Sequence, residues 1–244
     1  MKLHVINSNS QGNCYILEGK TETLLIECGV RFDKIKKALK FNFKKVVGCL
    51  VTHEHKDHCF AVNDLLGIGI DVFSMYKTHE VIGTNFHHRA KFFEKGIVKT
   101  IGQFTVMAFD VRHDCADPVG FLIHHPECGK VVFITDTFLC EYKFSGLNNV
   151  IIEANYSLAI IDRKLKEDKK FLRDRVIQSH MNIETTLGVL KANDLSQVNN
   201  IVLIHLSDSN SNAADFKKSV QDKTGKNVFI AEAGLTIPFD ISPF

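Results

Sequence analysis

The sequence predicts a layered α/β fold. Short apolar runs of strand length recur along its 244 residues, and several of them are separated by segments in which apolar residues repeat at helical spacing. Histidine or aspartate closely follows four of the strand-like runs. Helices between strands cover the faces of the sheets that those strands form, so the pattern indicates sheet layers with helices outside and polar side chains at the strand ends.

The N-terminal half is predicted from its glycines and its apolar spacing. Gly12 and Gly19 separate three strand-like runs and mark the hairpins between them. A helix is expected where Phe32, Ile35 and Leu39 repeat at helical spacing. In chain order, the predicted elements are strands at 3–6, 14–19 and 23–29, a helix at 32–41, a strand at 45–51, a helix at 61–69, and a strand at 70–75.

The C-terminal half follows from similar signals. The sequence PECG at 126–129 joins two strands as a hairpin, and Asn182 can cap a helix that has Glu184 in its first turn. The charged stretch at 162–175 is interpreted as a solvated helical face, with a phosphate-attracting rim or a dimer contact as alternatives. The predicted elements are strands at 102–111, 119–125, 130–135 and 149–156, a helix at 182–193, a strand at 199–207, a helix at 212–225, and strands within 227–239.

The composition is that of an ordinary globular protein. It is 45% hydrophobic and 24% charged, and its net charge of +2 is too weak to indicate nucleic acid or an anionic membrane by itself. The seven cysteines form no C-x-x-C pair, which favours reduced thiols in the cytosol. No signal-peptide core and no stretch of ~20 apolar residues is present. We therefore expect a soluble cytoplasmic protein without membrane contact, folded as a single domain over residues 1–244.

The segment LVTHEHKDHCF, residues 50–60, places three histidines, a glutamate and an aspartate after an apolar run. Such groups are costly to take out of water unless something compensates them, and a metal ion is the candidate. In an extended segment, His53, His55 and Asp57 would share one face, and His58 would turn away where a helix begins. Four potential ligands in six positions predict two ions, one held by the histidine pair and the other by Asp57 and His58. The spacing is not H-E-x-x-H, which excludes a zincin helix.

Three further positions can supply the remaining ligands. His113, Asp136 and His205 each stand at the end of a separate predicted strand. One such residue alone would more often be structural. Together, at the exits of separate strands, they complete a two-metal set.

These segments carry a resemblance to a known family. THEHKDH, HDCADPVGF, FITDT and LIHLS resemble the successive metal motifs of the metallo-β-lactamase fold. SNSQGNCYIL and LLIECGV resemble the opening strands of its YycJ-type and RNase Z-like phosphodiesterase branches. The resemblance covers essentially the whole chain and implies a four-layer αβ/βα sandwich with two mixed sheets. The metal ligands that it implies are His53, His55 and His113 for one ion, Asp57, His58 and His205 for the other, and Asp136 as the bridge between them.

The chain also departs from these relatives. Glu27 in IECG stands where such families have aspartate, and we expect this to alter a contact behind the metal loop without removing a ligand. Asp136 and His205 are only 69 positions apart, too few for the large cassette of the β-CASP nucleic-acid enzymes. A long Gly/Pro-rich arm of the kind that RNase Z uses to grip tRNA is absent from the sequence. These differences argue against a dedicated RNA processor.

The predicted chemistry is phosphodiester hydrolysis. Two metal ions bridged by a carboxylate activate water at neutral pH and bind both oxygens of an in-line displacement. Asp57 would be both ligand and orienting base. His180 in QSHMNIETT resembles the histidine that RNase Z-like enzymes use for proton transfer, so it is expected to protonate the leaving alkoxide, with a local structural role as the alternative.

Several functions remain open at this point. The compact chain resembles the anti-Pycsar proteins, which hydrolyse 3′,5′-cyclic mononucleotides to nucleoside monophosphates and so silence antiviral signalling; the location would then be the host cytoplasm if the chain is phage-encoded. A YycJ-type 5′-3′ DNA exonuclease is the alternative, and nucleic acid is a partner only under that interpretation. A non-catalytic metal-stabilised module is disfavoured by seven shared ligands. Thioester, lactone or β-lactam hydrolysis stays open because fold does not determine function.

The resemblance further implies two divalent metal ions and a homodimer. Zinc is the expected metal, with manganese or iron as alternatives, because imidazole and carboxylate ligands suit all three.

Overall fold

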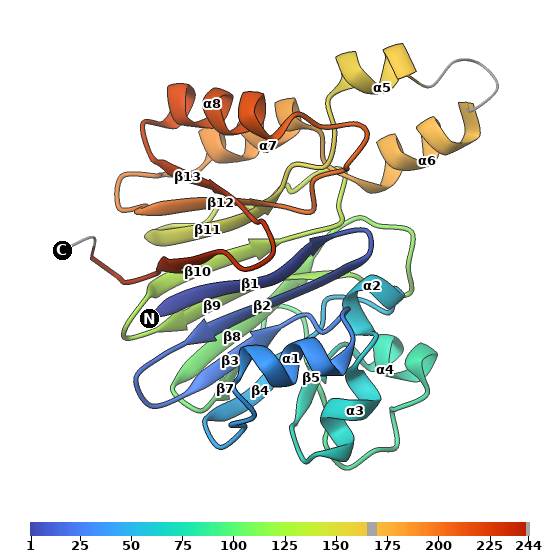
Figure 1. The fold of residues 1–244 in the computed structure, drawn as a ribbon, viewed down its shortest axis with the longest axis vertical. Helices are drawn as coiled ribbons and strands as arrows, with labels where there is room; N and C mark the ends of the chain where they lie inside the picture. Colours follow the sequence, from blue (N-terminus) through green and yellow to red (C-terminus); the bar gives the residue numbers. More distant parts are fainter. Residues whose placement is uncertain (165–169, 243–244) are drawn as a thin grey trace.

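Two β-sheets stacked face to face form the centre of the molecule, and helices cover both outer faces (Figure 1). The computed structural model describes residues 1–164 and 170–242. The predicted four-layer αβ/βα sandwich with two mixed sheets is thereby confirmed.

The first sheet contains seven strands in the order β14-β1-β2-β3-β4-β5-β6. Neighbours from β14 to β3 run antiparallel, whereas β3, β4, β5 and β6 run parallel. Its strands are β1 (Lys2–Asn9), β2 (Gly12–Glu18), β3 (Thr23–Ile26), β4 (Val46–Leu50), β5 (Val72–Ser74), β6 (Ala90–Phe92) and β14 (Thr236–Pro238).

The second sheet has the order β13-β12-β11-β10-β9-β8-β7. The strands β10, β11, β12 and β13 are parallel, and β7 to β10 form an antiparallel meander. Its strands are β7 (Val98–Ile101), β8 (Phe104–Asp110), β9 (Val119–His125), β10 (Gly129–Ile134), β11 (Leu147–Glu153), β12 (Asn200–Ile204) and β13 (Asn227–Ile230).

The helices divide between the two outer layers (Figure 1). Beside the first sheet lie α1 (Phe32–Ala38), α2 (Lys56–Cys59), α3 (Val62–Gly67) and α4 (Tyr76–Ile82). Beside the second sheet lie α5 (Leu158–Lys164), α6 (Lys170–Ser179), α7 (Ile183–Ala192) and α8 (Ala213–Thr224). Among the described residues, none of the helices combines the length and apolarity that crossing a membrane requires.

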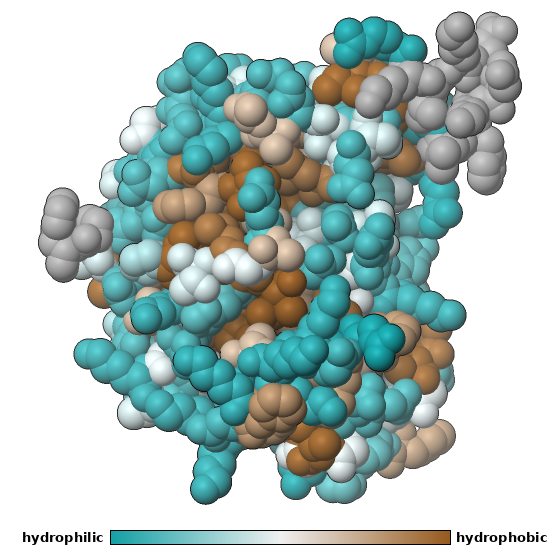
Figure 2. Space-filling view, in the orientation of Figure 1, coloured by the Kyte–Doolittle hydropathy of each residue, from teal (hydrophilic) through white to brown (hydrophobic). Residues whose placement is uncertain are grey.

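Apolar side chains between the sheets form the main core. Leu3 and Tyr15 from the first sheet pack in one cluster with Phe121 and Phe133 from the second, and the Tyr15 and Phe133 ring centroids are 5.5 Å apart. Each such buried side chain contributes about 1.5–3 kcal/mol relative to an exposed one. On the face shown in Figure 2, apolar side chains gather in the middle of the molecule between hydrophilic outer layers. The core therefore holds the two sheets, and the strand ends they carry, in one position.

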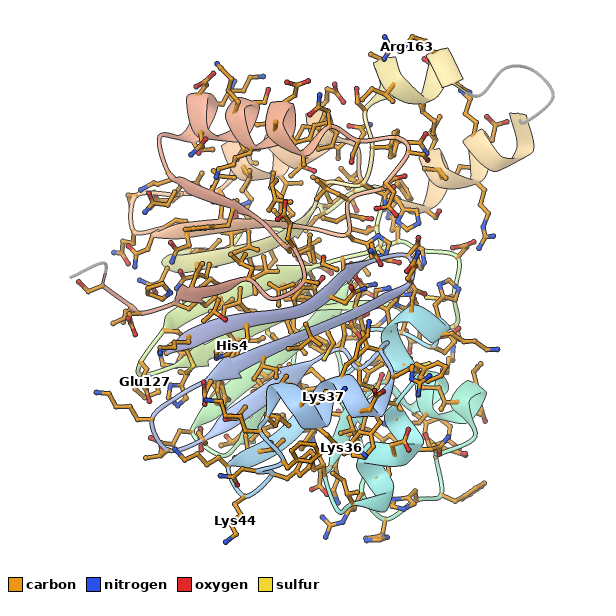
Figure 3. The ribbon with its side chains drawn as sticks, viewed as in Figure 1. His4, Lys36, Lys37, Lys44, Glu127 and Arg163 are labelled. Atoms are coloured by element: carbon orange, nitrogen blue, oxygen red, sulfur yellow. The ribbon has the colours of Figure 1, made fainter. Side chains whose placement is uncertain are left out.

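Charged side chains occupy the outer surface. Lys36 and Lys37 on α1 and Lys44 before β4 belong to one outer layer, whereas Arg163 on α5 lies at the opposite end of the molecule, and His4 and Glu127 lie near the N-terminus (Figure 3). The basic residues of the chain are thus spread over distant elements.

The structure corrects several predicted elements. The helix expected at 61–69 is shorter and is preceded by the separate turn α2 at Lys56–Cys59. The strands β6 and β7 and the helix α4 were not predicted, because each is short and carries mixed apolar and polar residues. The charged stretch is helical in α5 and α6 on either side of 165–169, which lie outside the described residues.

Candidate metal centre

The residues of the histidine motif come from two different local structures. His53 and His55 lie in the loop that follows β4, which bends at Glu54, while Asp57 and His58 belong to the single turn of α2. The expectation that Asp57 shares an extended face with the two histidines is therefore wrong. The turn at α2 instead directs Asp57 and His58 to a second group of ligand atoms.

The other predicted residues arrive from the second sheet. His113 follows β8, Asp136 follows β10, and His205 follows β12. Asp136 and His205 adopt positive φ angles of 44° and 54°, a conformation that is sterically unfavourable for residues other than glycine. Strained residues of this kind cluster at functional sites, where surrounding packing holds them in place.

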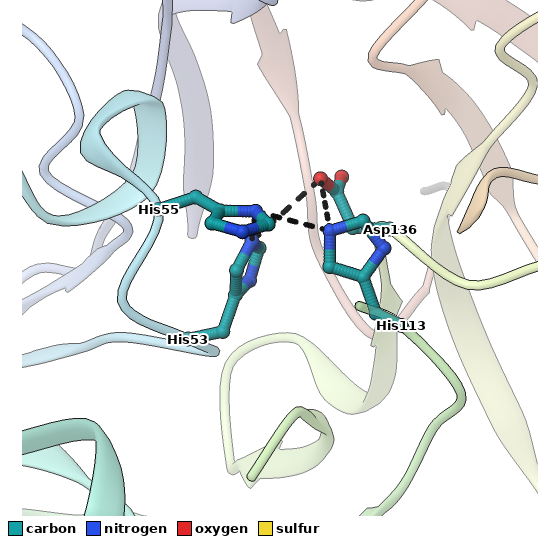
Figure 4. Close-up of side chains that lie close together, drawn as sticks. All are labelled: His53, His55, His113 and Asp136. Atoms are coloured by element: carbon teal, nitrogen blue, oxygen red, sulfur yellow. Dashed lines mark hydrogen bonds and ion pairs between the residues drawn. The ribbon is translucent and has the colours of Figure 1, made fainter. Parts of the chain in front are cut away.

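One group of potential ligand atoms comes from His53, His55, His113 and Asp136 (Figure 4). His55 Nδ1 lies 3.1 Å from His53 Nε2 and 3.1 Å from His113 Nε2. Asp136 Oδ2 is 3.7 Å from His53 Nε2 and 3.6 Å from His113 Nε2. These four atoms can hold one metal ion.

A second group lies beside the first and shares Asp136 with it. Asp57 Oδ2 is 3.4 Å from His58 Nε2 and 3.4 Å from His205 Nε2. Asp136 Oδ2 is 3.3 Å from His58 Nε2, and its Oδ1 is 3.6 Å from His205 Nε2. The carboxylate of Asp136 thus faces both groups, the place that the family resemblance implies for a bridge.

Hydrogen bonds outside the cluster leave two inward-facing nitrogens without a proton. His113 Nδ1 donates to the carbonyl oxygen of Ser179 at 2.8 Å. Thr52 Oγ1 donates to Glu27 Oε1, so it accepts the proton of His53 Nδ1 at 2.9 Å. Neutral His53 and His113 therefore direct the lone pairs of Nε2 at the same point, which is repulsive unless a cation lies there. This donor set fits a divalent metal ion.

Because these side chains are buried, water cannot offset the repulsion between them, and the need for a cation is greater. His53, His58, Asp136 and His205 are almost fully buried. Burial lowers the pKa of His53 and of His113. For Asp136, burial alone would raise the pKa of the carboxyl, but the surrounding histidines hold it below its usual range. His53 and His113 thus favour the neutral imidazole and Asp136 the ionised carboxylate, the forms in which these groups bind metals, whereas Asp136 and Glu27 outweigh burial and raise the pKa of His58.

Asn13 on β2 and Glu27, which directly follows β3, contact the histidine motif and hold it in position. Glu27 is fully buried, accepts from the Thr52 amide and hydroxyl, and lies 3.4 Å from His58 Nδ1 through its Oε1 atom. Asn13 Nδ2 donates to the Asp57 carbonyl at 3.2 Å. The side chain of Glu27, which is longer than the aspartate of the related families, therefore still contacts the segment that carries the histidine motif.

Gly29 provides the space into which the loop packs. A Cβ at Gly29 would lie 1.6 Å from the Asp57 carbonyl oxygen and 2.5 Å from the His58 amide nitrogen. Gly29 N also donates to Asn13 O. Only glycine lets the turn that carries Asp57 and His58 approach the end of β3 this closely.

His180 lies directly after α6 and beside the cluster. Its ring stacks on His205 with centroids 5.3 Å apart, and its Nδ1 is 2.6 Å from Glu153 Oε1. Burial alone would lower the pKa of His180, but the carboxylates of Glu153 and Asp136 outweigh it and raise the pKa to about 9. At neutral pH the ring is protonated and can donate from Nε2.

Glu153 is the residue that sequence reasoning missed. It is fully buried at the end of β11, and its Oε2 accepts from the Thr137 and Met181 amides at 3.1 and 3.2 Å. A carboxylate ending the apolar run NVIIE was the available signal, the same one that identified Asp136.

The cluster opens into a hollow of about 510 Å³. Lys56 and Arg175 supply positive charge to its lining, and His180 faces it beside the ligand groups. Arg175 belongs to the charged stretch and also pairs with Asp114 at 3.3 Å. The stretch therefore contributes to the rim of the site, one of the two alternatives that the sequence left open.

Comparison with known proteins identifies the family. Residues 8–142 match the metallo-beta-lactamase superfamily. Exodeoxyribonuclease YycJ from Bacillus anthracis is 30% identical over an alignment of 175 residues, and the match covers 66% of this chain and 66% of that protein. The match thus spans slightly less than two thirds of the relative's length.

Solved structures share the fold over nearly the whole chain. The metallo-beta-lactamase fold protein YhfI from Bacillus subtilis superposes with a TM-score of 0.70 at 16% identity, covering 97% of this chain and 98% of the other. The short form of human tRNase Z superposes with a TM-score of 0.64 at 17% identity, with the same coverage.

The packing at Gly29 leads to a stability prediction. Gly29→Ala should lower the free energy of unfolding by roughly 1–3 kcal/mol, the usual cost of overpacking, and should also reduce metal content because Asp57 and His58 are displaced. Urea denaturation and elemental analysis measure the two effects. Gly188→Ala on α7 is the control, since nothing lies within 4 Å of its added Cβ; equal behaviour of the two variants would contradict the packing role.

Proposed function

This chain belongs to the metallo-beta-lactamase superfamily, and from that premise we propose that it is a metal-dependent phosphodiesterase. The observation that carries the proposal is the pair of His180 and Glu153, which places an imidazole hydrogen-bonded to a buried carboxylate next to a cluster of inward-facing ligand atoms. A phosphodiester leaves as an alkoxide that needs a proton, and this arrangement supplies one.

We assign the metal ligands as the resemblance implies. Asp136 is the shared carboxylate, and Asp57 also orients the attacking water. When bound, two divalent ions supply Lewis-acid activation and positive charge at the phosphate. We propose zinc as the metal and a homodimer as the working form. The ligands are His53, His55 and His113 in one group and Asp57, His58 and His205 in the other.

His180 acts as the general acid in this proposal. Glu153 accepts from its Nδ1, which orients the ring and keeps Nε2 protonated. Two backbone amides, of Thr137 and Met181, hold the other oxygen of Glu153, so the carboxylate cannot turn away. Glu153 is therefore a positioning residue that acts through His180.

The first proposed substrate is a 3′,5′-cyclic mononucleotide. The hollow over the ligand groups has a volume of about 510 Å³, enough for one nucleotide, and Lys56 and Arg175 in its lining can neutralise a phosphate. The short connection between Asp136 and His205 leaves no cassette for gripping a polymer. With this substrate, the biological role would be to counter cyclic-nucleotide antiviral signalling.

The second proposed substrate is the end of a DNA strand. The 30% identity to a protein named exodeoxyribonuclease favours it. A further hollow of about 540 Å³ along α6 shares Asp114, Arg175 and Ser179 with the first, so a strand could continue from the ligand groups along this helix.

The metal assignment is tested by removing the shared carboxylate. Asp136→Ala should lose both bound ions, because both groups depend on its oxygens. Metal content per chain after dialysis is the measurement, with Asp64→Ala on the exposed face of α3 as the control. Retention of two ions by the Asp136 variant would contradict the assignment.

The proton-donor assignment is tested at His180. His180→Ala should lower turnover by roughly 10²–10⁴-fold while metal content is unchanged, the usual size of a general-acid loss. Glu153→Gln should lower turnover less, since the ring remains. The exposed His124, replaced by alanine, is the control. Full activity in the His180 variant would refute its role.

A parallel turnover assay of the metal-loaded protein distinguishes the two proposed substrates. Cyclic CMP, UMP, AMP and GMP are compared with end-labelled single- and double-stranded DNA. Opening of the cyclic nucleotides with DNA intact supports the first substrate, whereas stepwise DNA degradation that is lost with Asp136→Ala supports the second. Inactivity on both would overturn the phosphodiesterase proposal.

A further inference from the structure

We propose that a separate hollow next to the one over the ligand groups binds the nucleobase of the substrate and selects bases that carry an exocyclic amino group. The hollow over the ligand groups is called the catalytic hollow and the separate one the second hollow. The second hollow has a volume of about 380 Å³. The inference rests on the proposed function, because it assigns the base end of a nucleotide whose phosphate lies at the ligand groups.

The two hollows are adjacent. Leu206 and Ser207, which directly follow the predicted ligand His205, line both of them. Ser8 lines the second hollow, and its Oγ accepts from the His205 amide at 2.9 Å. A nucleotide with its phosphate at the cluster can therefore reach the second hollow with its base.

The walls suit a flat heterocycle. Ile230 and Ala231 at the end of β13 and Ala213 at the start of α8 provide aliphatic surface on which a ring can lie. Ring faces are apolar, while ring edges need hydrogen-bond partners. This apolar surface alone would not distinguish one base from another.

Polar groups on the hairpin between β1 and β2 can bind the edge of the ring. Asn7 Nδ2 donates to Asn9 Oδ1 at 3.0 Å and to the Gly12 carbonyl at 2.6 Å. Within the described part of the chain, these bonds leave Asn7 Oδ1 as an acceptor and Asn9 Nδ2 as a donor without a protein partner. An acceptor and a donor on two hydrogen-bonded amide side chains can pair with the donor and acceptor on a base edge.

The charge of the lining separates the two ends of a nucleotide. The second hollow is lined by the exposed acids Asp208 and Glu232, and neither lysine, arginine nor histidine belongs to its described lining. The catalytic hollow carries Lys56 and Arg175, and its acids are Asp114, which pairs with Arg175, and Asp57 and Asp136 of the ligand groups. With divalent ions bound to those ligand groups, phosphate is attracted to the catalytic hollow and repelled from the second one.

The N-terminus of α8 does not make the second hollow attractive to phosphate. Asn212 Oδ1 accepts from the Asp215 amide, and Asp215 places a further negative charge in the first turn. The carboxylates thus favour amino donors of adenine, cytosine and guanine. They disfavour uracil, whose single N–H lies between two carbonyl oxygens.

The test is equilibrium binding to the full metal-loaded chain, which does not require turnover. Isothermal titration compares 5′-AMP, 5′-CMP, 5′-GMP, 5′-UMP and inorganic phosphate. We expect the three amino-bearing nucleotides to bind about tenfold more tightly than 5′-UMP, the discrimination that one good edge contact supplies. In the double variant Asp208→Asn with Glu232→Gln, this ratio should fall towards one, even if all affinities rise from the lost repulsion.

A second variant tests the place of binding. Ala213→Phe should fill the hollow and weaken nucleotide binding towards that of phosphate, whereas Ala214→Phe, at the exposed next position of α8, should not. Equal binding of 5′-UMP and the other nucleotides, or unchanged binding in Ala213→Phe, would overturn the inference. Failure of the phosphodiesterase proposal would appear separately, as absent turnover with base-selective binding retained.

Discussion

The burial of imidazole and carboxylate groups at the meeting edges of two sheets is the constraint on which this site depends. Ionisable side chains taken out of water are costly unless each one is paired, hydrogen-bonded or bound to a metal. Here Thr52 and Ser179 accept hydrogen bonds from His53 Nδ1 and His113 Nδ1, Glu27 lies 3.4 Å from His58 Nδ1, and the inward-facing atoms converge on a space that suits cations. The same groups that would destabilise an apolar core are thus arranged so that they could hold metal ions.

The sandwich makes this convergence possible. The histidine motif follows a strand of the first sheet, whereas Asp136 and His205 follow strands of the second, so neither sheet alone contains the cluster. The apolar layer between the sheets fixes the distance between those strand ends. It also holds Asp136 and His205 in left-handed backbone conformations that are unfavourable by themselves. Core packing and site geometry are therefore coupled, and the approach of Gly29 to Asp57 shows the same coupling locally.

The two hollows beside the cluster differ in charge and polarity. On one side, His180 held by Glu153 offers a proton, and Arg175 and Lys56 offer positive charge. In the adjacent second hollow, the lining is amide, hydroxyl, aliphatic and acidic. A nucleotide has the complementary asymmetry, with an anionic phosphate at one end and a neutral ring at the other. This asymmetry links the proposed reaction to the proposed base selection.

The sequence by itself predicted the layered fold and brought attention to His53, His55, His113 and Asp136, because polar residues at the ends of apolar strands are rare without a function. Their role as ligands stays a prediction, although the structure brings their atoms together. Only the tertiary structure revealed the contact between His113 and Ser179, the bond between Glu153 and His180, and the second hollow beside His205. Spacing along a chain reports which face a side chain occupies within its own element. It cannot report which distant side chain will meet it, because that depends on how the two sheets pack.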